Sequence, residues 1–294
     1  MRHSLYGWNR KLHRPAASTT DIQNVNRSKI SIVIPTLNQG ETIEDTLLSI
    51  INQDYSNYEI IVMDGGSQDK TMEIISRYST WIKHSISQKD KGQSNAINNG
   101  FKLASGSLFT WINSDDYYLP GAFTRVVQAF EENLDCDIIV GDGCIVTIGS
   151  EWLKDIKAMQ MTKTNLLGWK DDRWVMQQSC FWKAKIWNDS GGVDESLQLL
   201  MDFDLWLRFS EKGKSFTINE KLAAMRYYPE AKSVSLKRKV NEELAYVYAK
   251  NNAFEHLREL VRDMVARNED LSAIINAYNN RITTRLLKRL RIRI

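Results

Sequence analysis

The sequence predicts an α/β fold in which a Rossmann-like, mostly parallel central sheet is flanked by helices and followed by a helical extension. Short β-branched runs alternate with amphipathic helical patterns from residue 29 onward, as in successive βαβ units. The first runs are apolar throughout, which is typical of parallel strands buried on both faces. Ligands of such sheets bind at the carboxyl ends of the strands.

The expected elements follow in chain order. We expect parallel strands at residues 30–36, 58–63, 84–87 and 108–112. The helices between them begin near residues 41, 69 and 92. After Pro120 the pattern changes, and we expect two strands of a hairpin-like excursion, an apolar aromatic stretch, a helix and a late strand, at residues 137–140, 144–148, 177–182, 202–209 and 214–218.

Three segments make up the expected domain organisation. Residues 1–28 are polar and aperiodic, and we expect a leader with little order of its own. Residues 29–230 form the α/β domain. Residues 231–294 form a helical C-terminal extension, and its end is basic and amphipathic, with Arg281, Arg285, Lys288, Arg289, Arg291 and Arg293.

Composition narrows the class of protein. Hydrophobic residues make up 43% and charged residues 26% of the 294 residues, which excludes a disordered, collagen-like or coiled-coil chain. No apolar stretch approaches the ~20 residues of a membrane-spanning helix, and no signal peptide is expected. The three cysteines suggest free thiols in a reducing cytoplasm. A net charge of +3 gives no reason to expect nucleic-acid binding.

The end of the strand at 108–112 carries the sharpest motif, Asn113-Ser114-Asp115-Asp116. Adjacent carboxylates repel each other unless a cation or a hydrogen-bond donor joins them. Mg²⁺ or Mn²⁺ prefers oxygen ligands and leaves coordination positions for phosphates, so the pair suits a metal that bridges a diphosphate. The alternative is a solvated turn that caps the next helix.

Two further loops are candidates for ligand binding. Asp64, at the end of the strand at 58–63, can accept the imide N–H of uracil or thymine, and the glycines after it allow close approach. Its alternative role is an N-cap or Asx turn before the next helix. The segment at residues 88–94 sets a carboxylate, cations and an amide before a helix, which suits a sugar, a phosphate or merely a solvated loop.

Taken in this order, the motifs resemble those of the family 2 glycosyltransferases, which have the GT-A nucleotide-sugar-binding fold. The resemblance covers roughly residues 29–230. It rests on SIVIPTLN, EIIVMDGGSQDKT, DKGQSNAINNG, LFTWINSDD, GGVDE and MDFDLWLR at residues 31–38, 59–71, 90–100, 108–116, 191–195 and 201–208.

The resemblance implies roles by position. Asp115 is the expected direct ligand of Mn²⁺ or Mg²⁺, with Asp116 in support, although Asn113 replaces the first acid of the family's DxD motif. Gly65 stands where the family has a second acid. The residues implied to bind the nucleotide sugar are Pro35, Thr36, Asn38, Asp64, Gly65, Asp90, Gln93, Asn113 and Ser114.

The distal motif implies the catalytic base. Asp202 corresponds to the Asp of the family's Glu-Asp pair, whose Glu is Met201 here. An inverting transfer needs a carboxylate that takes the proton of the acceptor hydroxyl. Asp204 is the alternative base, or else an ion-pair partner of Arg208. The expected acceptor pocket comprises Gln178, Trp182, Asp204, Trp206 and Arg208, where the two tryptophans could equally belong to the core.

The resemblance therefore implies a metal-dependent, inverting glycosyltransferase for surface polysaccharide or glycoconjugate synthesis. UDP-sugars or dTDP-sugars are the favoured donors, and a glycan or a lipid-linked saccharide is the expected acceptor. We expect a cytoplasmic protein whose basic tail contacts the inner face of the plasma membrane. The alternatives are a non-catalytic nucleotide-sugar-binding protein and a sugar nucleotidyltransferase.

Overall fold

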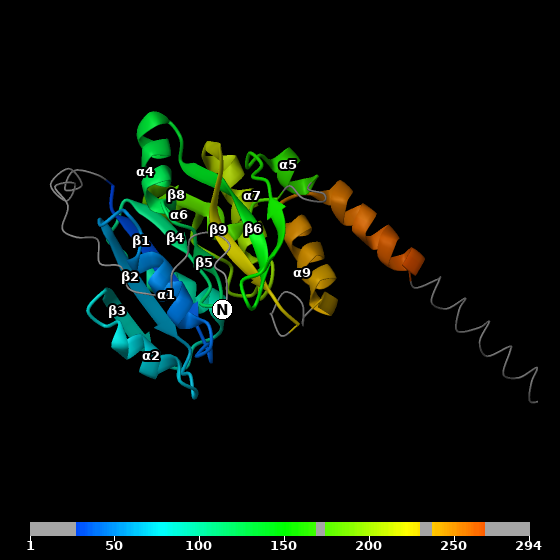
Figure 1. The fold of residues 1–294 in the computed structure, drawn as a ribbon. Helices are drawn as coiled ribbons and strands as arrows, with labels where there is room; N and C mark the ends of the chain where they lie inside the picture. Colours follow the sequence, from blue (N-terminus) through cyan, green and yellow to red (C-terminus); the bar gives the residue numbers. More distant parts are fainter. Residues whose placement is uncertain (1–27, 169–173, 230–236, 268–294) are drawn as a thin grey trace, which may run out of the picture. The chain divides into compact units, whose positions relative to one another are not determined.

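A computed structural model describes residues 28–168, 174–229 and 237–267 (Figure 1). The chain divides into two units, Met1–Lys237 and Arg238–Ile294, which are described separately here. The expected leader at residues 1–28 and the basic tail lie outside the described residues, apart from residue 28.

The first unit is built on one sheet, which has nine strands among the described residues. Four adjacent strands are parallel, as the sequence predicts, and the structure orders them β3-β2-β1-β4. Their bounds are Ile82–Ser87, Tyr58–Asp64, Ile30–Thr36 and Leu108–Trp111. The sheet continues in the order β8-β6-β9-β5, while β7 pairs with β6. These strands are Cys180–Lys183, Ile138–Thr147, Ser215–Tyr227, Tyr117–Tyr118 and Trp152–Ile156.

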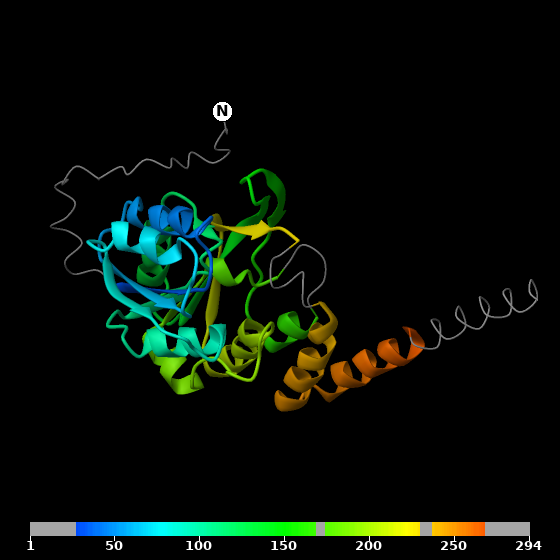
Figure 2. The same ribbon diagram turned by 90° about the horizontal axis from the view of Figure 1, so that it is seen from below.

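Helices cover both faces of the sheet (Figure 2). On one face α1 (Ile43–Ile51), α2 (Thr71–Arg77) and α4 (Ala122–Glu132) bury their apolar stripes against alternate residues of β1 and β2. On the other face α3 (Gln93–Phe101), α6 (Ala184–Ser190) and α7 (Met201–Lys212) enclose a core rich in tryptophan. A short helix, α5 (Lys163–Leu167), packs on α7.

Several expected bounds were wrong. The strands expected at 137–140 and 144–148 form one strand, β6, because backbone pairing with β9 runs through Gly141, Asp142 and Gly143. The hairpin partner of β6 is β7 instead. The late strand, β9, runs far beyond residue 218, since it pairs with both β6 and β5. The stretch at 177–182 begins as a single 3₁₀ turn, Gln177–Ser179, before β8.

The second unit is described as far as residue 267. It contains α9 (Lys237–Lys250, which begins at the boundary) and helical turns from residue 254 to residue 267, in agreement with the helical pattern of the sequence. Among the described helices, none combines the length and the apolar character that crossing a bilayer requires. Cys136, Cys144 and Cys180 are free, buried thiols, as expected.

A buried carboxylate fastens the amino-terminal edge of the sheet. Glu59 on β2 is 4% exposed and accepts hydrogen bonds from Ser31 Oγ and Lys29 Nζ, each at 2.6 Å, and from the backbone N–H of Ser105 at 2.6 Å. Burial alone would raise the pKa of Glu59, but these donors outweigh it and lower the pKa to about 2. The ionised carboxylate therefore stabilises the folded chain.

Glu59→Gln should lower the free energy of unfolding near neutral pH by about 2–3 kcal/mol, since one pKa unit corresponds to about 1.4 kcal/mol. The folded pKa of about 2 lies below the unfolded value of 4.5. The contribution is thus present above pH 4.5 and is lost as the pH falls toward 2. Urea unfolding of wild type and variant at several pH values measures this. Glu132→Gln, at an exposed position, serves as the control, and a gap between wild type and Glu59→Gln that persists in acid contradicts the account.

Candidate functional site

The polar residues singled out in the sequence gather at the carboxyl edge of the parallel strands. Thr36 and Asp64, the last residues of β1 and β2, lie opposite each other in the ladder. Asn113 follows β4 on the other side of β1, where the backbone N–H of Ile112 still bonds to the carbonyl of Val33. The βαβ topology thus assembles one site from three separate motifs.

Asp64 orders the loop that follows its own strand. Its carboxylate is 2% exposed and accepts hydrogen bonds from the backbone N–H of Ser67 at 3.0 Å and from the hydroxyls of Ser67 and Ser87 at 2.5 and 2.6 Å. The backbone N–H of Gly66 adds a fourth donor at 3.2 Å. The Asx turn, one of the two alternatives open from the sequence, is therefore present, and it fixes the carboxylate at the strand end.

The ends of β1 and β2 are fastened to each other. Asn38 has a left-handed backbone, with φ 53°, and its N–H bonds to Ser67 Oγ at 2.7 Å. Its Oδ1 accepts from the N–H of Gln68 at 2.9 Å. Pro35 and Thr36 are buried, and Thr36 Oγ1 has no hydrogen-bond partner among the described residues. A buried hydroxyl without a partner is costly and points to a missing polar ligand.

The loop before α3 reaches the same edge. A Cβ at Gly65 would lie 3.1 Å from Asp90 Oδ2, so the space of a larger residue 65 is taken by the Asp90 side chain. Asp90 Oδ1 accepts from the N–H of Gly92 at 2.8 Å, immediately before the helix begins. Gln93 Nε2 then donates to Asn113 Oδ1 at 2.7 Å. These contacts connect the loops after β2, β3 and β4.

The two aspartates after β4 have different surroundings. Asp116 is 2% exposed, and its oxygens accept from Gln178 Nε2 at 2.5 Å and from the N–H of Arg226 at 2.8 Å. Burial, and then the charge of Asp115, raise the pKa of Asp116 well above its usual range. Protein donors therefore hold both oxygens of Asp116, and its expected support of a metal stays a prediction. Ser114 is buried in the same turn.

Asp115 is only half-buried. Tyr228 Oη donates to its Oδ2 at 2.7 Å, and Arg226 Nη1 donates to its backbone carbonyl at 2.8 Å. Among the described residues, no group of three or more His, Cys, Asp or Glu side chains could hold a metal. Asp115 is therefore the carboxylate of this turn that can meet a cation, and the remaining ligands would have to come from a diphosphate and water.

Two residues that organise this turn were missed in the sequence. Arg226, near the end of β9, is 3% exposed and forms an ion pair with Asp45 of α1 at 2.5 Å. Its guanidinium also lies 4.9 Å from the ring centre of Tyr117. The available signal was a single cation in the otherwise uncharged run at residues 222–229, since charges are rarely buried without a partner.

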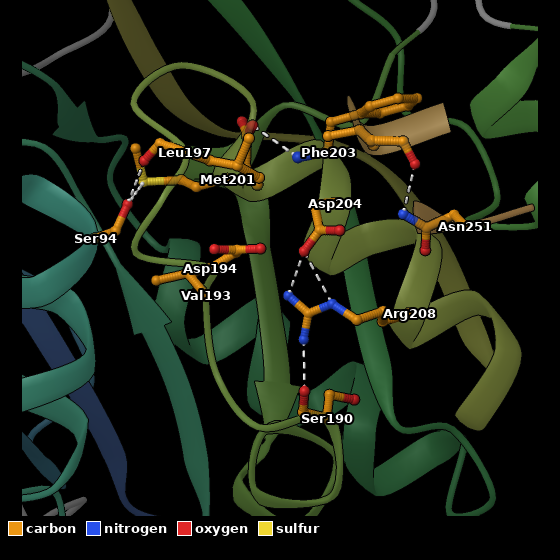
Figure 3. A network of polar contacts seen from close by, with 12 residues as sticks. Ser94, Ser190, Val193, Asp194, Leu197, Met201, Phe203, Asp204, Arg208 and Asn251 are labelled. Carbon is orange, nitrogen blue, oxygen red and sulfur yellow. Dashed lines mark hydrogen bonds and ion pairs between the residues drawn. The ribbon is translucent and has the colours of Figure 1, made fainter. Parts of the chain in front are cut away.

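The distal motif docks on α3 (Figure 3). Asn98 bonds to both the carbonyl and the N–H of Val193, at 2.9 and 3.0 Å, and Gly192 has φ +73° with a Cβ position only 2.5 Å from Asn98 Oδ1. Ser94 Oγ lies 2.9 Å from the carbonyl of Leu197 and 3.1 Å from Met201 Sδ. Met201, which replaces an acid of the family pattern, is therefore a buried contact of α3.

Asp202 and Asp204 differ sharply, although both lie in the first turn of α7. The side chain of Asp204 is fully buried and bonds to Arg208 Nη2 at 2.7 Å, and Arg208 Nη1 donates to the carbonyl of Ser190 (Figure 3). Asp202 is half-buried. Burial of Cys180 raises the pKa of its thiol, and the negative charge of Asp202 raises that pKa further. Cys180 follows Gln178 closely in the chain, and Gln178 bonds to Asp116, so α7 begins near the turn after β4.

The residues expected in the acceptor pocket make internal contacts in the structure. Trp182 and Trp206 are 0% and 2% exposed and pack with Trp111 in the aromatic core, at ring distances of 5.3 and 5.8 Å from it. Gln178 is buried against Asp116. Asp204 and Arg208 form an ion pair with each other. Their side chains are committed to internal contacts, which leaves Asp202 as the carboxylate of the distal motif that can meet a ligand.

Asp204→Asn should lower the free energy of unfolding by about 3 kcal/mol, because it leaves the Arg208 charge without its buried partner. Asp202→Asn should change it by less than about 0.5 kcal/mol, because Asp202 is half-buried and an amide oxygen can also accept the hydrogen bond that the N–H of Phe203 donates. Urea unfolding of both variants beside wild type measures the difference. Equal stability of the two variants would contradict the assignment of Asp204 to a structural ion pair.

Known proteins resemble this chain in sequence. A family model described as "Glycosyl transferase family 2" matches residues 31–187, slightly more than half of the chain. An uncharacterized glycosyltransferase of Rickettsia typhi is 27% identical over 211 residues, which cover 70% of this chain and 66% of that protein. The GalNAc(5)-diNAcBac-PP-undecaprenol beta-1,3-glucosyltransferase of Campylobacter jejuni is 30% identical over 49% of this chain and 47% of its own. The chain spans 32–66% of the length of four Rickettsia relatives.

Solved structures agree on the fold. S. aureus TarS 1–349 in complex with UDP-GlcNAc superposes with a TM-score of 0.62 at 16% identity, over 79% of this chain and 71% of that one. The mannosyltransferase PcManGT from Pyrobaculum calidifontis, in complex with GDP-Man and Mn²⁺, gives a TM-score of 0.59 at 14% identity, over 89% and 82% of the chains. At these identities the likeness establishes the GT-A fold.

Proposed function

The chain belongs to glycosyl transferase family 2, and from this membership we propose that it transfers a sugar from a nucleoside diphosphate sugar to a hydroxyl group of a glycan or lipid-linked acceptor. The observation that carries the proposal is the convergence of Thr36, Asp64, Asn113 and Asp115 at one sheet edge, with the half-buried Asp202 nearby. The acceptor class rests on the name of the Campylobacter relative, which acts on an undecaprenol-linked saccharide.

The nucleotide is proposed to bind between the ends of β1 and β2. The unpartnered hydroxyl of Thr36 and the fixed carboxylate of Asp64 offer polar contacts to a uracil or thymine base, with Pro35 and Asn38 beside them. A carboxylate has about four acceptor sites, so Asp64 can hold its loop and also accept an imide N–H. UDP-sugars or dTDP-sugars remain the favoured donors. Asp90 and Gln93 are placed to meet the ribose or the sugar.

Asp115 is proposed to hold Mn²⁺ or Mg²⁺ with the donor diphosphate. One carboxylate, phosphate oxygens and waters make a suitable set for either ion, which commonly takes only one or two protein carboxylates. When bound, the cation would neutralise negative charge that develops on the departing diphosphate. Asn113 and Ser114 belong to the same turn as Asp115. Asp116 fixes this turn through its hydrogen bonds to Gln178 and Arg226.

Asp202 is proposed as the general base of a direct, inverting transfer. Its carboxylate takes the proton of the acceptor hydroxyl while that oxygen bonds to the anomeric carbon of the donor sugar. The bond from the anomeric carbon to the diphosphate oxygen breaks, and the nucleoside diphosphate leaves with that electron pair. A role in bacterial surface polysaccharide synthesis at the inner face of the plasma membrane, with contact through the tail, is part of the same proposal.

A panel of sugar nucleotides tests the proposal. We expect one UDP-sugar or dTDP-sugar to release nucleoside diphosphate slowly with Mn²⁺ or Mg²⁺ and to stop releasing it with EDTA. Asp115→Ala should reduce the rate by about 100-fold or more, the usual effect of losing a group that stabilises developing charge. Asp135→Ala, at an exposed position at the opposite edge, is the matched control. Turnover that survives EDTA or Asp115→Ala unchanged contradicts the metal assignment.

Asp202→Asn should keep the affinity for the nucleoside diphosphate but lower kcat of transfer by about 10²- to 10⁴-fold, because the amide cannot accept the proton. Calorimetry with the nucleotide and single-turnover transfer to the acceptor measure the two quantities separately. An unchanged kcat excludes Asp202 as the base, and an equal loss of binding and transfer shows a role in donor binding instead.

A further inference from the structure

The end of β9 and the residue that follows it contribute two side chains to Asp115 that belong to none of the sequence motifs. Arg226 donates a hydrogen bond to the Asp115 backbone carbonyl, and Tyr228, the first residue after β9, donates one to the Asp115 carboxylate. One short segment of the chain thus holds both the backbone and the side chain of Asp115.

The backbone contact is rigid because Arg226 is fixed on several sides. Its side chain is 1% exposed, and the guanidinium pairs with Asp45 at 2.5 Å and lies over the Tyr117 ring. The backbone N–H of Arg226 bonds to Asp116 Oδ1. Hydrogen bonds between ionised groups are about twice as strong as neutral ones. The main chain at Asp115 is consequently held in one conformation before any ligand arrives.

The side-chain contact selects one oxygen. Tyr228 Oη donates to Asp115 Oδ2 at 2.7 Å, whereas Oδ1 has no hydrogen-bond donor in the part of the chain that the structure describes. A tyrosine hydroxyl has an ordinary pKa of about 10, so it carries its proton and is a donor at neutral pH. The hydrogen bond therefore persists under the conditions of any assay near neutrality.

We propose that Tyr228 is a positioning residue that presents Asp115 Oδ1 to the cation and diphosphate of the donor. Arg226 supports this role of Tyr228 by fixing the main chain at Asp115. This inference rests on the proposed function. A metal-binding side chain that is held in place in advance loses less conformational freedom when the cation binds. Tyr228 contributes this preorganisation to Asp115.

Tyr228→Phe tests the inference, because it removes the hydroxyl and keeps the ring. Tyr227→Phe is the matched control: it makes the same change at the preceding, exposed position of the strand. Mn²⁺ binding is followed by the loss of the free-ion signal in electron paramagnetic resonance, at a fixed concentration of UDP. Asp115→Ala gives the level that UDP alone produces, and thermal unfolding of every variant reports on the fold.

We expect Tyr228→Phe to weaken Mn²⁺ binding about tenfold, because it removes a hydrogen bond to a charged group. The Mn²⁺ concentration for half-maximal donor turnover should rise equally, and the melting temperature should stay near that of Tyr227→Phe. Binding that is unchanged or tighter in Tyr228→Phe, while Asp115→Ala has none, overturns the inference and leaves the proposed function intact. Wild-type binding no stronger than that of Asp115→Ala overturns the metal site itself, and the inference with it.

Discussion

The arrangement of the site depends on one buried ion pair, between Arg226 and Asp45. Asp115 and Asp116 lie next to each other at the end of β4, and two neighbouring carboxylates in a partly buried turn repel each other unless donors join them. Arg226 provides those donors from its guanidinium and its backbone, and Asp45 of α1 balances its charge. Without Arg226, the turn would bury negative charge with no cation beside it.

Sheet topology is what brings Arg226 to this place. β5 pairs antiparallel with β9, with Tyr117 opposite Ala224, and continuing this register brings Asp115 opposite Arg226. Two residues further on, Tyr228 bonds to the Asp115 side chain. The pairing of β5 with β9 thus also sets the geometry of the ligand site.

The same principle separates the roles of neighbouring acids twice. Asp116 and Asp204 are buried and have their oxygens or charge satisfied by Gln178, Arg226 and Arg208, so they hold structure. Asp115 and Asp202 are half-buried, and they are the members of each pair that can meet a ligand. Environment, rather than residue type, assigns the function of each carboxylate.

Local patterns were sufficient to predict much of this from the sequence. The apolar runs and the motifs at their ends predicted β1, β2 and β4 and the edge at which they meet, because both are encoded within a few residues. The sequence left open whether Trp182 and Trp206 face a ligand or the core, because an aromatic residue beside a motif looks the same in both cases, and the structure buries both. The ion pair of Arg226 with Asp45 was missed because strand order fixes a pairing between residues far apart in the chain, and the lone cation at residue 226 does not identify its partner.

A crystal structure with UDP and Mn²⁺, with anomalous scattering measured at the manganese edge, tests the central claim most directly. The account predicts one manganese peak beside Asp115 that also contacts the diphosphate, with Asp116 still bonded to Gln178 and Arg226 and the base between the ends of β1 and β2. Manganese bound by Asp116, or a nucleotide bound away from this edge of the sheet, would contradict it.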